Sequence, residues 1–130
     1  MRILVVEDDA RRAAWFVHEF AEHDLVLVNT AREAIAILKF CQFEFLFLDH
    51  DLGNRTFVKT GDENCGQRVA DFLAGEMDPP PNVVIHSWNP EGAETMLETL
   101  RRAKLPVRQV PFGSFGKSIV YDFGRMAELA

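Results

Sequence analysis

Short apolar runs alternate along this chain with longer segments whose apolar residues recur at helical spacing. The first four runs contain no charged position, which is typical of strands buried on both faces of a sheet. The segment after the first run carries Ala13, Phe16, Val17 and Phe20 on one stripe and predicts an amphipathic helix. The five predicted strands occupy residues 3–6, 25–28, 45–48, 83–85 and 107–112.

Strands that alternate with helices predict a parallel sheet covered on both sides. We therefore expect an α/β fold, a doubly wound five-stranded parallel sheet, in a single domain over residues 1–130. A length of 130 residues suits one domain and is too short for two ordinary ones. Thr30 and Glu33 form a capping box that starts the second helix, and Ile119, Phe123 and Met126 predict a last helix.

Charge and cysteine content limit the partners and the compartment. The net charge of −6 disfavours general binding of nucleic acid, because phosphate neutralisation supplies most non-specific affinity. No apolar run reaches the roughly 18 residues of a membrane span, and the first nine residues do not form a signal peptide, so we expect a cytoplasmic protein without membrane contact. Cys41 and Cys65 lack a CxxC partner, which argues against zinc; we expect Cys41 in or near the core and Cys65 in a loop.

Polar residues gather directly after the predicted strands. In doubly wound sheets, ligands bind beyond the carboxyl ends of the strands. Several carboxylates at one edge repel each other unless a cation lies among them, and oxygen ligands suit Mg²⁺, or Mn²⁺ in its place. The predicted metal ligands are Asp8, Asp9, Asp49 and Asp51.

Two histidines at the same edge point to chemistry on a phosphate. His50 and His86 could serve as general acid and base, with Asp49 as the third catalytic residue, because imidazole titrates near neutrality. The alternative is that each histidine only ties a loop to the backbone. The predicted phosphate or substrate contacts are Ser87, Asn89, Arg55 and Lys117. Their alternatives are a turn residue for Ser87, a helix N-cap for Asn89 and a solvated loop charge for Arg55.

Four landmarks in order resemble the receiver domain of response regulators. They are the acidic group 7–9 after the first strand, Asp49 after the third, Ser87 after the fourth and Pro111-Phe112 in the fifth. The resemblance implies a receiver or flavodoxin-like fold, a metal held by the acidic group and a phosphate-accepting role for Asp49. Val110 stands where a receiver carries the lysine that holds the phosphoryl group.

The segments Leu48-Asp49-His50-Asp51-Leu52 and His86-Ser87-Trp88-Asn89 resemble a narrower group, the cyclic-phosphate-processing receiver-like family. This resemblance implies metal-dependent processing of a cyclic or terminal phosphate on an RNA end or nucleotide. The alternatives are a stand-alone receiver phosphorylated on Asp49, or a degenerate receiver that binds a protein partner. Trp88 could stack on a base, although a partly buried aromatic is the commoner outcome.

Overall fold

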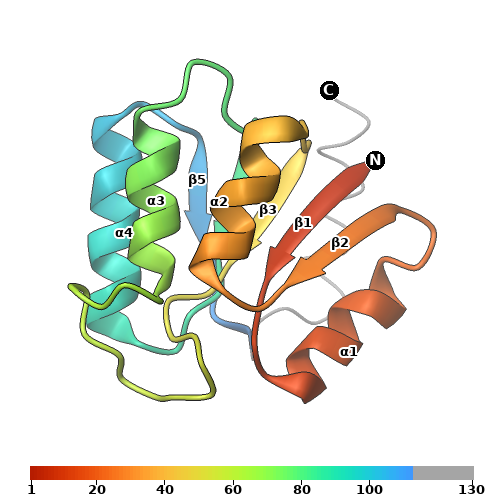
Figure 1. The fold of residues 1–130 in the computed structure, drawn as a ribbon, viewed down its shortest axis with the longest axis horizontal. Coiled ribbons are helices and arrows are strands. Elements are labelled where there is room, and N and C mark those ends of the chain that lie inside the picture. The colour runs from red at the N-terminus through yellow and green to blue at the C-terminus, as the bar shows by residue number, and fades with distance from the viewer. Residues whose placement is uncertain (113–130) are drawn as a thin grey trace.

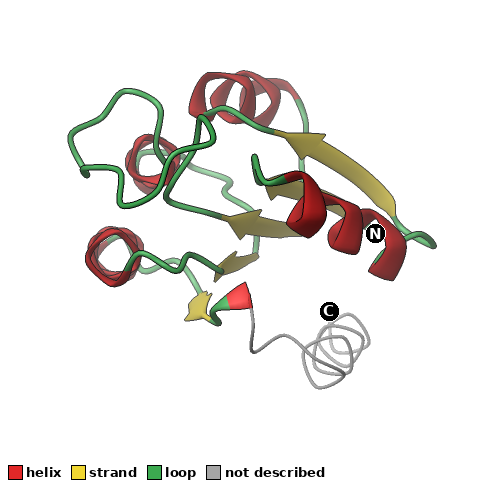
Figure 2. Ribbon diagram, turned by 90° about the horizontal axis from the view of Figure 1, so that it is seen from below, coloured by secondary structure: helices red, strands yellow, loops and turns green. Residues whose placement is uncertain are grey.

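A computed structural model describes residues 1–112 as a five-stranded parallel sheet with helices packed on both faces (Figures 1 and 2). The strand order is β2-β1-β3-β4-β5, so the chain reverses direction across the sheet between β1 and β3. This arrangement confirms the predicted doubly wound α/β fold. The strands are β1 (Arg2–Val6), β2 (Asp24–Val28), β3 (Phe45–Leu48), β4 (Asn82–Ile85) and β5 (Val107–Gln109). The helices are α1 (Ala10–Glu19), α2 (Ala31–Phe40), α3 (Gly66–Ala74) and α4 (Pro90–Arg102).

Alternate residues of the buried strands supply two separate cores. Leu4, Leu46 and Ile85 face one side and pack with apolar residues of α2, α3 and α4. Val5 and Phe47 face the other side and pack with Phe16 and Phe20 of α1 and with other buried apolar residues. Since both faces are covered, β1, β3 and β4 need apolar residues at nearly every position, which accounts for the uninterrupted apolar runs.

Side chains at three helix N-termini match their sequence signals. Asp9 accepts hydrogen bonds from the backbone N–H groups of Arg11 and Arg12 at the start of α1. Thr30 caps α2 and also bonds the Glu33 carboxylate, which confirms the capping box. Asn89 caps α4 by accepting from the N–H of Gly92, so its N-cap alternative is confirmed.

The structure corrects one strand boundary predicted from sequence. The fifth strand ends at Gln109 and not at Phe112, because Pro111 has no N–H for the ladder, although Val110 N still donates to Ile85 O at 2.8 Å. Cys65 lies in the loop before α3, as expected, where it occupies the N-cap position and is fully buried. The predicted last helix and Lys117 lie outside the described residues. Within residues 1–112, no helix has the length and apolar character that a membrane crossing requires.

Candidate functional site

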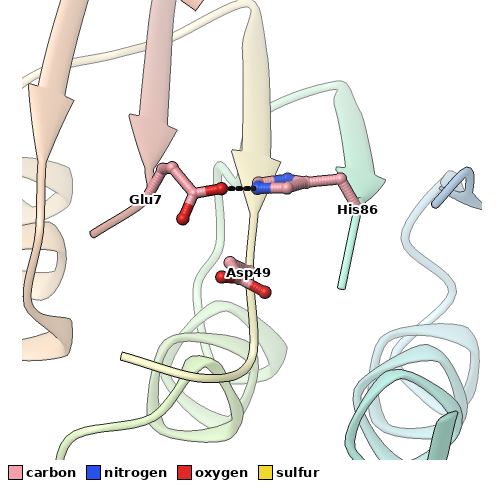
Figure 3. Close-up of side chains that lie close together, drawn as sticks. All are labelled: Glu7, Asp49 and His86. Carbon is pink, nitrogen blue, oxygen red and sulfur yellow. Dashed lines mark hydrogen bonds and ion pairs between the residues drawn. The ribbon is translucent and has the colours of Figure 1, made fainter. Parts of the chain in front are cut away.

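The pairing register brings three polar residues into a row at the carboxyl edge of the sheet. Val6 pairs with Leu48, and Leu48 pairs with Ile85. Glu7, Asp49 and His86 are the residues that directly follow these three, so they leave β1, β3 and β4 at the same level. Figure 3 shows the three side chains converging. One ligand atom of each lies within 4.8 Å of the other two.

Glu7 is the most heavily bonded member of this cluster. Its Oε2 accepts from the backbone N–H groups of Asp8 and Asp9, and its Oε1 lies 3.2 Å from Nε2 of His86. A carboxylate can only accept, so Nε2 of His86 carries the proton. Burial raises the pKa of Glu7, but the hydrogen bonds and charges of His86 and Arg12 outweigh burial and lower it to about 2. Glu7 is therefore a fixed negative charge.

Asp49 is almost fully buried, with 3 % of its surface exposed, and only one of its two carboxylate oxygens accepts a hydrogen bond among the described residues. Its Oδ1 accepts from the N–H of His50, whereas its Oδ2 has no hydrogen bond within the described part of the chain. Burial, followed by the charge of Glu7, raises the pKa of Asp49 to about 7 despite the opposing charges of His86 and Arg12. A second carboxylate at this point thus needs a proton or a further cation to be stable.

Arg12, in the first turn of α1, is a cationic side chain that approaches both of these acids. Its Nε lies 2.5 Å from Oε1 of Glu7, and one terminal nitrogen lies 3.6 Å from Oδ2 of Asp49. The side chain remains 28 % exposed, so the guanidinium reaches the cluster from the solvent side. Val110 occupies the place of the lysine expected in a receiver and packs against the α1 core. Arg12 thus places a positive charge beside the two carboxylates, whereas Val110 carries none.

The cluster fits a divalent metal ion on two grounds. Two carboxylates and one imidazole converge within ligand distance of each other, and Oδ2 of Asp49 is a buried acceptor without a hydrogen bond among the described residues. Carboxylate oxygens suit Mg²⁺ and Mn²⁺. Because Arg12 pairs with the same two carboxylates, a metal ion that binds both of them would compete with its guanidinium.

The structure gives the other predicted metal ligands different partners. Asp8, next to Glu7, is half-buried and accepts from the N–H of Asn54, and burial raises its pKa. Asp9 caps α1. Asp51 turns into the loop after β3, where it accepts from the N–H groups of Phe57 and Val58. Of the four predicted ligands, only Asp49 belongs to the converging cluster.

His50 lies inside the protein and away from solvent. Its ring packs against Gly92 in α4 so closely that a Cβ at that position would lie 2.3 Å from the ring. Nδ1 lies 2.9 Å from Oδ1 of Asp51. Burial lowers the pKa of His50, but contacts with Cys65 and Asp51 outweigh it and raise the pKa. This placement matches the alternative in which a histidine holds a loop, and the imidazole of His50 is not part of the converging cluster of Glu7, Asp49 and His86.

The predicted substrate contacts also bond to other residues of the protein. Ser87 is buried, and its Oγ accepts from the N–H of Asn89. The Asn89 amide donates to Asp51 and to the carbonyl of Val58. Arg55 is exposed and forms a bidentate pair with Asp62, as the loop-charge alternative expects. Trp88 is 62 % exposed, which contradicts the expected partial burial.

Sequence reasoning left out two members of this site. Glu7 was grouped with the acids after the first strand but not chosen as a ligand; its direct position after an in-register strand is the signal that finds it. Arg12 lies five residues after Glu7, inside a helix, and no motif marks it. Only the packing of α1 against the sheet brings its guanidinium to the carboxylates.

A cavity of about 620 Å³ lies at the opposite, amino edge of the sheet, lined among others by Arg2, Cys41 and Phe43. Large cavities are common ligand sites. Here, however, the converging titratable groups lie at the carboxyl edge, where doubly wound sheets bind ligands. The candidate site is therefore the cluster at the carboxyl edge and not this cavity.

Residues 3–102 match the family model of the cyclic-phosphate processing receiver domain. No protein among the curated sequences matches this chain.

Several solved structures with a similar fold are receiver domains. The response regulator domain of CheB from Thermotoga maritima has 16 % sequence identity and a TM-score of 0.68, with 96 % of this chain and 94 % of that chain covered. The receiver domain of the sensor histidine kinase PA1611 from Pseudomonas aeruginosa, with magnesium coordinated in its active-site cleft, has 12 % identity, a TM-score of 0.65 and coverage of 96 % and 92 %. The Mn²⁺-bound form of response regulator Rcp1 has 16 % identity, a TM-score of 0.59 and coverage of 84 % and 79 %.

Proposed function

The chain belongs to the cyclic-phosphate processing receiver domain family, and we propose that it is a metal-dependent phosphoesterase that acts on a cyclic or terminal phosphate of an RNA end or nucleotide. The observation that carries the proposal is the buried cluster of Glu7, Asp49 and His86 with Arg12 on its open side. This cluster combines ligands for a cation with a second, fixed positive charge. A phosphate ester needs both, because its charge must be neutralised before a nucleophile can attack.

Glu7 and Asp49 would hold the metal ion, and the imidazole of His86 would stay hydrogen-bonded to Glu7. Magnesium or manganese bound there would neutralise phosphate charge and lower the pKa of a bound water. Glu7 is ionised at every working pH, and Asp49 becomes a ligand when it gives up its proton. The two magnesium- and manganese-bound receivers are similar in fold, which supports a hard divalent cation at this edge of the sheet.

Arg12 would bind the phosphate oxygens. Its guanidinium, once displaced from the carboxylates by the cation, has five N–H donors and a planar shape that suits phosphate. This role replaces that of the lysine missing at Val110. His50 is too deeply buried to touch a substrate, so we assign it a positioning role for the loop after β3.

The reaction we propose is hydrolysis of a 2′,3′-cyclic phosphate. Water adds to phosphorus, the bond from phosphorus to one ribose oxygen breaks, and the proton lost by the water ends on that ribose oxygen. The product is a phosphomonoester. We assign this proton transfer to His86, whose Nε2 carries a proton against Glu7.

The test uses a short RNA with a 2′,3′-cyclic phosphate, incubated with wild-type protein, with Asp49→Asn and with Asp71→Asn. Asp71 is an exposed carboxylate on α3 paired with Arg68 and serves as the matched control. We expect product from the wild type and from Asp71→Asn in Mg²⁺, and none from Asp49→Asn or in a chelator. Absence of product from folded wild-type protein, together with labelling of Asp49 by acetyl phosphate, would support the stand-alone receiver instead.

A further inference from the structure

Two large aromatic side chains are exposed beside the candidate site. Phe57, in the loop between β3 and α3, is 75 % exposed, and Trp88, in the loop between β4 and α4, is 62 % exposed. Both loops leave the carboxyl edge of the sheet, at the bottom of Figure 1. A large aromatic ring in water loses the favourable free energy of burial, so two of them at one functional edge call for a ligand.

The backbone at Phe57 is built to keep this ring outside. Its φ of +52° lies in the left-handed region, which a bulky residue rarely adopts. The carboxylate of Asp51 holds this conformation, since it accepts from the N–H groups of Phe57 at 2.7 Å and Val58 at 3.1 Å. The turn directs Val58 inward, where it is buried, and Phe57 outward. Strained residues of this kind occur preferentially at functional sites.

Asn89 joins the two aromatic loops to each other. Its side-chain amide donates to the carbonyl of Val58 at 3.2 Å and to Oδ1 of Asp51 at 3.1 Å. Trp88 directly precedes Asn89, and Phe57 directly precedes Val58, so both aromatic residues adjoin the same hydrogen bond. Trp88 also follows His86 of the cluster by two residues.

We propose that Phe57 and Trp88 stack on the base of the nucleotide whose phosphate is bound by Arg12 and the cluster. The proposal rests on the proposed function and assigns the contacts to the nucleobase of its substrate to these two residues. Stacking on aromatic side chains tolerates any base, because every base has a π face. It also suits a chain with a net charge of −6, which gains little affinity from general contacts to a phosphate backbone.

The probe is the 2′,3′-cyclic phosphate of 2-aminopurine riboside, whose fluorescence falls when its base stacks, recorded in Mg²⁺ ahead of turnover. We expect quenching by the wild type, and affinities about 5- to 100-fold weaker for Trp88→Ala and Phe57→Ala. Phe40→Ala is the matched control. Phe40 is 87 % exposed, but it ends α2 and thus lies at the amino edge of the sheet. Phe57→Leu, which keeps apolar volume but removes the aromatic face, should behave like Phe57→Ala.

A second substrate separates this inference from the proposed function. Ribose 2′,3′-cyclic phosphate has no base, so its hydrolysis should proceed equally in wild type, Trp88→Ala and Phe57→Ala. One outcome is that the wild type quenches the probe, the two alanine variants do not, and neither substrate is hydrolysed. This outcome would support stacking and contradict the phosphoesterase activity. Hydrolysis of both substrates, with equal probe affinity in all variants, would overturn stacking and leave the exposed aromatics to a protein partner.

Discussion

His86 and Glu7 form a buried hydrogen bond between strands that are not neighbours in the sheet. Nε2 of His86 lies 3.2 Å from Oε1 of Glu7, and β3 runs between β4 and β1. Neither side chain has exposed area. The pair therefore crosses over the end of β3, and this is where Asp49 emerges (Figure 3). Because this pair links β1 to β4 and also belongs to the cluster, its loss should affect both the stability of the sheet and the geometry of the site.

This pair predicts strong thermodynamic coupling. We expect Glu7→Gln and His86→Ala each to lower the free energy of unfolding, because each leaves a buried partner without its charge-assisted bond. The double variant should be less destabilised than the sum, with a coupling energy of about 1–3 kcal/mol in urea unfolding. The exposed pair Glu98 and Arg102 on α4 is the control, with expected coupling of about 0.5 kcal/mol or less. Equal coupling in the two pairs would contradict the buried bond.

Asp49 predicts that metal affinity depends on pH. Its pKa is raised to about 7 from an ordinary 3.8, so in the metal-free protein the folded state holds a proton that the unfolded state has lost between these values. The stability contribution of this carboxyl therefore falls as pH rises across that window. A bound cation takes the place of this proton. Mg²⁺ affinity should thus rise by up to about tenfold per pH unit toward pH 7 and level off above it.

Mg²⁺ titrations by calorimetry at several pH values in this range measure the effect. Asp49→Asn, which has no proton to lose, should bind weakly at each pH and show no such slope. A wild-type affinity that is flat from acid to neutral pH would show that Asp49 is already ionised in the metal-free protein.

Arg12 predicts opposite effects on metal binding and on turnover. Arg12→Ala removes the guanidinium that neutralises Glu7 and approaches Asp49, so the carboxylates should bind Mg²⁺ more tightly. Hydrolysis of the cyclic phosphate should fall by about 100-fold or more, because a donor to the phosphate is lost. Arg11→Ala is the control, since the Arg11 side chain is exposed and only its backbone N–H bonds the cap. Arg12→Ala with weaker Mg²⁺ binding would contradict the competition we infer.

Sequence patterns predicted the fold because the three central strands, β1, β3 and β4, are buried on both faces along most of their length. Val5 and Phe47 show this directly: they face α1, while their neighbours Leu4 and Leu46 face α2, α3 and α4, so no position tolerates a charge. Such runs, with turn residues between them, predict order and type of elements. They do not predict where the pairing between two strands ends. The strand β5 ends three residues before the predicted boundary because Pro111 has no N–H to continue the pairing.

Site residues were harder to predict because charge alone does not give side-chain direction. Asp8, Asp9 and Asp51 have the same side chain as Asp49 and also come shortly after a strand, yet they bond loop or helix N–H groups and do not join the converging cluster. The backbone dihedrals of a turn decide this, and they are not visible in residue types. Register is the signal that separates them, since Glu7, Asp49 and His86 each follow the last paired residue of a strand.

The N-terminus of α3 gives the last prediction, which tests how Asp49 is held in place. Gly66, the first residue of α3, donates its N–H to the carbonyl of His50 at 2.8 Å, so the helix begins directly against the end of β3. A Cβ on Gly66 would lie 2.0 Å from the backbone oxygen of Asp49 and 2.8 Å from Sδ of Met96. Backbone cannot give way as a flexible side chain does, so Gly66→Ala must push α3 away from β3.

We expect Gly66→Ala to lower the free energy of unfolding by at least about 3 kcal/mol in urea and to weaken Mg²⁺ binding in the protein that remains folded. Gly75→Ala, at the other end of the same helix, is the control. A Cβ there meets only the carbonyl oxygen of Phe72 at 3.7 Å, an ordinary contact, so its effect should stay within about 1 kcal/mol. If both variants unfolded at the same urea concentration, α3 would not approach the Asp49 backbone this closely, and the rigid support for that carboxylate would have to come from elsewhere.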